Sequence, residues 1–267
     1  MGTRPPWNNK APYKDSTQSD HCLTGCTQVA AAQILYYLHY KIGKPVATYG
    51  FSTCNAYIPT GVDSLVLSSS DITFFHNAPL HWSDMPLTSS SSGQFDKVST
   101  LMMRIGFLYN AEFFVSRTSS NPSNAVTIFP SEFSISCSYL NPITVSQIAS
   151  ITRNQIYNNQ LPIQMSISRY EEDKKKSHSI ILDGYKYLEE SVTYTIVVYD
   201  MNGNPYIETN TVTEISRFLA INWGWDGVGD SDSSGNTIWY DITTPWIVSS
   251  YNYTEKNSFV YNFAAIN

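Results

Sequence analysis

The segment HCLTGCTQVAAAQILYY, residues 21–37, decides the fold of the N-terminal part of the chain. Strong helix formers follow Gly25. Ala30, Ile34 and Leu38 recur at four-residue spacing, so the pattern predicts a helix that begins at or just after Cys26. The unpaired N–H groups at a helix N-terminus favour an anion, and this position therefore biases the Cys26 thiol toward its nucleophilic thiolate form.

The composition restricts the class of protein. A chain of 267 residues fits one large domain or two small ones, with enough surface to bury a core. The net charge is −6, and the longest basic run is Lys174–Lys176, which argues against nucleic acid as a partner. Charged residues make up only 14% of the chain, while Ser, Thr, Asn and Tyr are abundant, which is typical of an exported bacterial or cell-surface protein.

The ends and the hydropathy of the chain add two expectations. No apolar run approaches the roughly 20 residues that a membrane-spanning helix needs, and residues 1–9 are polar. The sequence therefore predicts neither a transmembrane helix nor a signal peptide. If the protein is exported, the sequence corresponds to a trimmed, mature form, and we expect it to act as a monomer.

The four cysteines do not form the framework of a disulfide-rich fold. Cys22, Cys26, Cys54 and Cys137 are too few for such a scaffold at this length, although a Cys22–Cys54 disulfide stays open. No second Cys or His pair follows Cys22 and Cys26 at zinc-site spacing. We therefore expect no metal and no cofactor.

Hydrophobic periodicity divides the chain into two halves. It predicts further helices at 94–106 and 144–156, and loops with minor elements over residues 41–93. Runs rich in β-branched and aromatic residues predict strands at 162–168, 179–185, 194–200 and 218–223. The expectation is a single α+β domain, residues 1–267, with a helix-rich half over about 1–130 facing a strand-rich half over about 131–267 across a cleft.

A nucleophilic cysteine needs a base, and the chain offers five histidines. His39 follows Cys26 on the same predicted helix, about 20 Å away at a rise of about 1.5 Å per residue, so it is excluded. His21 precedes the helix and has no evident acceptor to orient it, and His76 and His81 in a turn-like region stay open. His178 is favoured because it begins the apolar run 179–182, where a strand holds a base rigidly. The alternative is a strand-edge residue without a role.

The segment Asn222-Trp223-Gly224-Trp225 ends the last of these strands. It is either a packed corner or the place where Asn222 orients the His178 imidazole and Trp223 shields that hydrogen bond from water. The order Cys, His, Asn along the chain matches the arrangement of papain-like hydrolases.

Together these segments resemble the motif series of the streptopain family of bacterial cysteine proteases. The resemblance rests on the N-terminal Trp7 with Pro12-Tyr13, on residues 22–34, on 178–185 and on 222–227, and it extends over nearly the whole chain. It implies a papain-like fold and a cysteine endopeptidase, secreted as a zymogen whose prosegment or a protein inhibitor covers the cleft. It also implies protein or peptide substrates with an apolar residue just before the one that supplies the scissile carbonyl.

Site residues follow from the resemblance position by position. Cys26 corresponds to the nucleophile, His178 to the general base and acid, Trp223 to the covering indole and Asn222 to the orienting residue. The family's oxyanion-hole Gln is replaced by Asn9, which is one methylene shorter and puts this donor in doubt. Asp226 stands where the family usually has Gly, and it is expected to affect substrate preference more than chemistry.

Two rival functions stay open at this stage. The first is an inactive or weakly active module of the same fold that acts as an adhesin or binding protein, as the replacement at Asn9 suggests. The second is a papain-like amidase or acyltransferase. The oxygen-rich segment 226–236 resembles a calcium loop but lacks the closing Glu, so a surface loop beside the cleft is the favoured interpretation.

Overall fold

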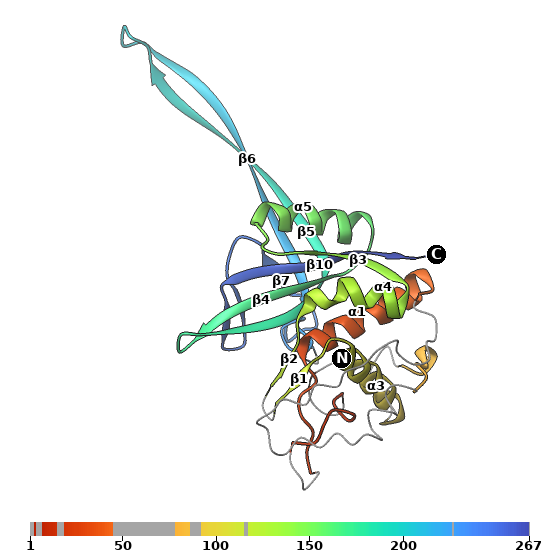
Figure 1. The fold of residues 1–267 in the computed structure, drawn as a ribbon. Helices are drawn as coiled ribbons and strands as arrows, with labels where there is room; N and C mark the ends of the chain where they lie inside the picture. Colours follow the sequence, from red (N-terminus) through yellow and green to blue (C-terminus); the bar gives the residue numbers. More distant parts are fainter. Residues whose placement is uncertain are drawn as a thin grey trace.

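The fold combines a few helices with one large antiparallel sheet (Figure 1), as expected of an α+β protein. The computed structural model describes residues 3, 7–14, 19–44, 78–85, 92–114, 117–225 and 227–266. Its helical elements are α1(Cys26–Ile42), η1(Trp82–Asp84), α3(Ser92–Leu108), η2(Pro122–Asn124), α4(Ala125–Phe133), α5(Val145–Thr152) and the π-helical turn η3(Arg153–Asn158). Its strands are β1(Glu112–Phe113), β2(Thr118–Ser119), β3(Ile135–Leu140), β4(Ile163–Glu171), β5(Lys174–Tyr199), β6(Pro205–Asn222), β7(Trp239–Asp241), β8(Trp246–Val248), β9(Tyr251–Tyr253) and β10(Glu255–Ala265).

Helix α1 begins at Cys26, as the sequence predicts, and runs through the centre of the helical layer. Its residues Ala30, Ile34 and Leu38 are all buried, which accounts for their four-residue spacing. The helix ends at Gly43, whose φ of 68° is the left-handed conformation that glycine adopts without steric cost. The predicted helices at 94–106 and 144–156 are also confirmed, as α3 and as α5 followed by η3.

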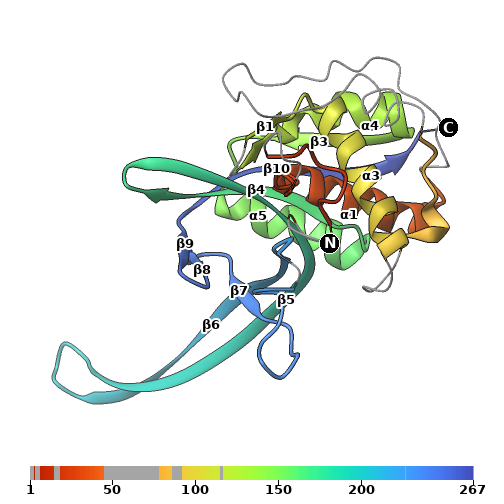
Figure 2. The same cartoon turned by 90° about the horizontal axis from the view of Figure 1, so that it is seen from below.

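The main sheet has the strand order β3-β10-β4-β5-β6-β7, and every neighbouring pair is antiparallel. Because side chains alternate along a strand, β5 contributes to two different cores. Ile181 joins the cluster formed mainly by α1, α3 and α4, whereas Ile180 and Leu182 join a second cluster with Ile148 of α5 and Trp246 of β8. The sheet therefore lies between the helical layer and α5 (Figures 1 and 2).

Strands β5 and β6 extend far beyond the sheet as a two-stranded ribbon, residues 186–217 (Figure 1). The sequence predicts two separate strands, 179–185 and 194–200, but the structure joins them into one strand of 26 residues. The intervening residues carry no turn because they pair with β6 residue by residue, from Lys186 with Phe218 to Thr193 with Thr211. Most of the predicted loop region 41–93 lies outside the described residues, as does residue 226.

No helix of the described part is long and apolar enough to cross a membrane. The predicted change from helices to strands near residue 130 corresponds to the end of α4 at Phe133 and the start of β3 at Ile135. Helix α5 is the exception, since it lies in the strand-rich half and packs on the face of the sheet opposite α1.

Candidate active site

The thiol of Cys26 lies at the first residue of α1. Gly25 precedes it in an extended conformation, and a side chain there would collide with the Gln28 amide, because a Cβ atom would lie 2.0 Å from Gln28 Oε1. The N–H groups of the first helical turn have no partner within the helix, so Cys26 Sγ lies beside backbone donors and the positive end of the helix dipole. A side chain at position 25 would therefore require the Gln28 amide to shift.

His178 lies on β5 beside Cys26, although the two residues are far apart in the sequence. Burial raises the pKa of the Cys26 thiol, but the hydrogen bond and the positive charge of His178 outweigh it and leave the pKa below its ordinary value. The backbone N–H of Ser179 contributes by donating to Cys26 Sγ over 3.3 Å, and the Thr27 hydroxyl adds a smaller effect. The sulfur is thus set up to carry a negative charge.

A backbone carbonyl orients the His178 ring. The Nε2 atom lies 2.8 Å from the carbonyl oxygen of Trp223, and since a carbonyl only accepts, Nε2 carries the proton of this hydrogen bond. The other ring nitrogen, Nδ1, is therefore left for the sulfur of Cys26. This arrangement fixes the tautomer in which the histidine is able to take a proton from the thiol.

Three aromatic rings surround the imidazole. Trp225 is the nearest, with its ring centroid 4.8 Å from that of His178, while Trp223 is nearly parallel to the imidazole at 6.4 Å and Tyr253 lies at 6.1 Å. Arg169 donates to the Tyr253 hydroxyl over 2.6 Å and so fixes the position of that ring. The sequence analysis predicted no role at this site for Trp225, Tyr253, Thr27 or Ser179. Only the Trp-Gly-Trp spacing pointed toward Trp225.

Asn222 has partners other than His178. Its Oδ1 atom accepts from Gln33 Nε2 over 3.3 Å and from the backbone N–H of Gly224 over 3.0 Å. Gly224 has a φ of 69°, and a Cβ atom there would lie 3.2 Å from Val29 Cγ1. The predicted orienting contact from the Asn222 side chain is thus absent from the described contacts. The backbone carbonyl of the next residue takes its place because the Asn222 amide ties the end of β6 to α1.

Asn9 lies in the turn that precedes α1 and faces α3. Its Nδ2 atom donates to Asp96 Oδ1 over 3.2 Å, and the same carboxylate pairs with Lys10 Nζ at 3.0 Å. A carboxamide has two N–H donors, so one remains for another acceptor. Trp7, the residue on which the N-terminal motif rests, is buried against Phe95, with ring centroids 4.7 Å apart.

The remaining histidines of the described part have other contacts. His39 stacks on Trp82 with ring centroids 5.0 Å apart, and His21 stacks on Tyr13 and contacts the carbonyl of Ala11 through Nδ1. His81 is half-exposed, and its Nδ1 atom lies 4.0 Å from an oxygen of Asp84. His76 lies outside the described residues.

The other described thiols differ from Cys26 in their ionisation. Cys22 and Cys137 are free, and burial raises their pKa values to about 11 and about 12. Cys54, the predicted alternative partner of Cys22 in a disulfide, lies outside the described residues. In the 227–236 loop, Asp230 accepts from the backbone N–H of Trp223, and Asp232 accepts from the N–H groups of Ser234 and Asn236. These carboxylates thus serve to hold the loop.

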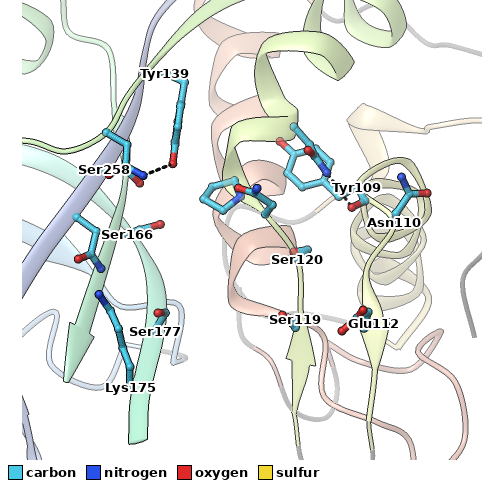
Figure 3. A pocket seen from close by; sticks show the side chains of 15 residues that line it. Tyr109, Asn110, Glu112, Ser119, Ser120, Tyr139, Ser166, Lys175, Ser177 and Ser258 are labelled. Carbon is cyan, nitrogen blue, oxygen red and sulfur yellow. Dashed lines mark hydrogen bonds between the residues drawn. The ribbon is translucent and has the colours of Figure 1, made fainter. Parts of the chain in front are cut away.

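A pocket of about 670 Å³ lies between the main sheet and the segment that links α3 to α4 (Figure 3). We call it the polar pocket, because five serines and five asparagines are among its fifteen lining residues, with one Lys and one Glu. Ser177 on one wall directly precedes His178, and Ser120 on the other wall accepts through its carbonyl from the Thr27 hydroxyl over 3.5 Å. The lining of the polar pocket therefore includes the residue before His178 and a residue that contacts Thr27, the neighbour of Cys26.

A thiol of lowered pKa at a helix N-terminus, paired with a histidine that a second acceptor orients, is the arrangement of a cysteine-type peptidase. Comparison with known proteins agrees with this class. The sequence profile described as the Peptidase C10 family, the streptopain family, matches residues 2–231. The chain therefore belongs to the Peptidase C10 family and is a cysteine-type peptidase.

Two solved structures with a similar fold come from Prevotella intermedia. Active wild-type interpain A, a cysteine protease of Prevotella intermedia, has a TM-score of 0.62 and 15% identity, and the alignment covers 97% of this chain and 90% of that chain. A mutant prointerpain A fragment of the same organism has a TM-score of 0.55 and 17% identity, with 97% and 68% covered. No match was found among curated proteins. At these identities the likeness concerns the fold.

Proposed function

We propose that the protein is a papain-like cysteine endopeptidase in which Cys26 is the nucleophile and His178 the general base and acid. The observation that carries this proposal is the pairing of the Cys26 thiol, whose pKa is lowered, with a histidine whose Nε2 is already bound to the Trp223 carbonyl. The single domain of residues 1–267 then holds its cleft between the helical layer and the edge of β5.

The proposed reaction has two stages. The Cys26 thiolate attacks the carbonyl carbon of a peptide bond, and the protonated Nδ1 of His178 gives its proton to the leaving amine, which leaves a thioester on Cys26. Nδ1 of His178 then takes a proton from water, and the hydroxide formed attacks the thioester and releases the acid. The carbonyl of Trp223 stabilises the imidazolium throughout, because it accepts from Nε2 over 2.8 Å.

The oxyanion of both tetrahedral intermediates needs two donors. We assign one to the backbone N–H of Cys26, at the first turn of α1, and the other to the amide N–H of Asn9 that does not bind Asp96. Asp96 then has the role of holding the Asn9 amide in place. Trp223 and Trp225 cover the His178 ring and limit the access of water to its hydrogen bond.

Expression as a secreted bacterial zymogen completes the proposal. Its support is the family membership, together with the structural likeness to prointerpain A, which is named as a pro form. The partners proposed are protein or peptide substrates and a prosegment or protein inhibitor that covers the cleft.

Substitution of the nucleophile tests the function. Cys26→Ala is expected to abolish hydrolysis of casein and of fluorogenic peptides, and to prevent labelling by an epoxide inhibitor of thiol proteases. Cys137→Ala is the matched control, because it removes a thiol whose pKa burial raises to about 12 and is expected to keep both properties. Peptide hydrolysis by the Cys26→Ala variant would overturn the assignment.

One observation favours a second candidate, a weakly active binding module. The Asn9 amide already bonds to Asp96, which draws this side chain toward α3. A module of this kind would show epoxide labelling at Cys26 without measurable peptide turnover. Activity confined to small amides would instead indicate an amidase or acyltransferase.

A further inference from the structure

The surface of the sheet that faces the helical layer becomes more polar toward His178. In one row, Ile181 and Val260 are buried in the helical core, with Gln164 between them. One row further along the strands, the register aligns Ser179, Ser166 and Ser258 across β5, β4 and β10, all on the same surface. These three serines therefore form a row of hydroxyl groups where aliphatic side chains would continue the core.

This row leads into the floor of the polar pocket. Ser166 and Ser258 line it directly, whereas the Ser179 hydroxyl accepts from Thr27 Oγ1 over 3.4 Å and from Gln164 Nε2 over 3.2 Å. Figure 3 shows Ser166 and Ser177 on the sheet side, opposite Ser119 and Ser120. Hydroxyl and amide groups thus line the two facing walls.

The lining of the polar pocket contains two charged residues, Lys175 and Glu112. Lys175 Nζ pairs with Glu255 Oε2 at 2.7 Å, so its positive charge is already compensated from outside the lining. Glu112 lies on the opposite wall (Figure 3). The ten serine and asparagine side chains outnumber these two charged residues and supply most of the hydrogen-bonding groups of the lining.

The direction of the substrate follows from the position of the proton donor. His178 gives its proton to the leaving amine, so the amine portion of the substrate lies on the side of β5 that carries the His178 ring, with Trp223 and Trp225. Ser177 and Ser179 alternate with His178 and point to the other side. The polar pocket is on that other side and therefore takes the acyl portion of the substrate.

The backbone of β5 offers a matching edge. Its pairing with β6 ends at Ile181, and the Ser179 N–H points away from β4 toward Cys26. By alternation, the Ser177 N–H and carbonyl point the same way, along an edge that β6 does not cover. If an extended substrate pairs with this edge, the residue immediately before the one that supplies the scissile carbonyl lies at the level of Ser177 and Ser120. Both of these residues line the mouth of the polar pocket.

We propose that the polar pocket selects a neutral hydrogen-bonding side chain, a hydroxyl or carboxamide, at the residue immediately before the one that supplies the scissile carbonyl. The inference rests on the proposed function and departs from the apolar preference that the family resemblance implies. The physical reason is that an apolar side chain would displace water from serine and asparagine groups without replacing their hydrogen bonds.

Fluorogenic peptides that differ only at this residue test the proposal. For the unmodified protein, kcat/KM with Gln, Asn, Ser or Thr is expected to exceed that with Leu, Val or Phe by about tenfold or more. Ser166→Val is expected to remove or reverse this preference, because it places two methyl groups on the floor of the pocket. Ser216→Val, on the exposed ribbon, is the matched control and should keep the preference.

The possible failures are distinguishable. Absence of both peptide turnover and epoxide labelling at Cys26 would contradict the proposed function itself. Turnover with a preference for Leu, Val or Phe in the unmodified protein would overturn this inference and leave the proposed function standing. If Ser166→Val unfolds, as thermal melting would show, Ser258→Ala serves instead, since it removes a hydroxyl from the floor without adding atoms, and an unchanged preference in it would count against the proposal.

Discussion

At the scale of single residues, the His178 imidazole divides its two nitrogens between a backbone carbonyl and a thiol. The Trp223 carbonyl accepts from Nε2 and so fixes the tautomer of His178 without a carboxylate or amide side chain. The Cys26 sulfur accepts a hydrogen bond from the N–H of Ser179, and the hydrogen bond and charge of His178 lower the pKa of the thiol. Each contact favours the thiolate over the thiol, and together they outweigh the effect of burial.

The ionisation of Cys26 is expected to depend on His178. A thiol is alkylated as its thiolate, which predominates above its pKa, so the lowered pKa of Cys26 lets alkylation by iodoacetamide persist to lower pH. His178→Ala removes the two largest contributions that lower the pKa and leaves the burial that raises it. The midpoint of the alkylation rate against pH should therefore move upward, measured in a Cys137→Ala background; an unchanged midpoint would contradict the pairing.

Asn9 is expected to raise kcat without changing the reactivity of the Cys26 thiol. Asn9→Ala should lower kcat by about 10- to 100-fold through loss of one oxyanion donor, with little change in epoxide labelling. Asp96→Ala should give a smaller loss, because it leaves the amide present but unheld. Asn9→Gln restores the family residue and should retain or raise kcat. Equal turnover in Asn9→Ala and the unmodified protein would remove Asn9 from the oxyanion hole.

At the scale of elements, the end of β6 and the start of α1 are fitted to each other. Gly224 has a left-handed conformation, and a Cβ atom added there would lie 3.2 Å from Val29, three residues after Cys26. The absence of a side chain at Gly224 lets the chain after the Trp223 carbonyl pass close to α1. The helix thus supplies the thiol, and the adjoining strand end supplies the acceptor that orients the base.

Substitution of Gly224 tests this fit. Gly224→Ala is expected to lower the free energy of unfolding by about 1–3 kcal/mol from backbone strain and the Val29 contact together. Gly203→Ala is the matched control, since its φ of 82° is also left-handed but nothing lies within 4 Å of an added Cβ. Urea unfolding should show the larger loss for Gly224→Ala. Equal losses would mean that the Val29 contact contributes nothing.

The ribbon of β5 and β6 is expected to be dispensable for the catalytic fold. Its residues Val192, Val197, Tyr199 and Ile207 are exposed, and paired hydroxyls such as Thr193 and Thr211, 2.9 Å apart, hold its strands together. Replacing residues 188–216 by Asn-Gly should change the free energy of unfolding by less than about 1 kcal/mol and leave hydrolysis of short peptides intact. A loss of cooperative unfolding in urea would show that the ribbon stabilises the body.

At the scale of the whole molecule, the site exists only where the helical layer meets the sheet. Cys26 belongs to the helical layer, and His178 belongs to β5 of the main sheet. Trp223 directly follows β6, and Tyr253 lies in β9. One of the polar contacts that join the helical layer to the sheet is the hydrogen bond from Gln33 to Asn222. This bond ties α1, which carries Cys26, to the end of β6 next to Trp223.

Loss of the Asn222 amide is therefore expected to affect stability more than chemistry. Asn222→Ala should lower the free energy of unfolding by about 1 kcal/mol and reduce kcat by less than about tenfold. A double-mutant cycle with Gln33→Ala, followed by urea unfolding, isolates the coupling between the two side chains. A fall in kcat as large as that of His178→Ala would instead show that Asn222 orients the base directly.

The sequence by itself determined the elements of local origin. Helix α1, its start at Cys26, α3 and α5 follow from periodicity and neighbouring residues, which act within a few positions along the chain. Residue type and position also pointed to Cys26 and to His178. Cys26 is a thiol at the start of a predicted helix, and His178 is a base at the start of a predicted strand. The family resemblance extended this to Trp223 and Asn9.

Only the tertiary structure decided which groups touch. The replacement of the Asn222 amide by the Trp223 carbonyl, the stacking of Trp225 on His178 and the bond from Asn9 to Asp96 depend on how strands and helices dock. The serine row across three strands depends on register, which no single strand sequence contains. Contacts between residues distant in sequence are set by packing of whole elements, and for this reason the sequence predicted the participants of the site but not all of their partners.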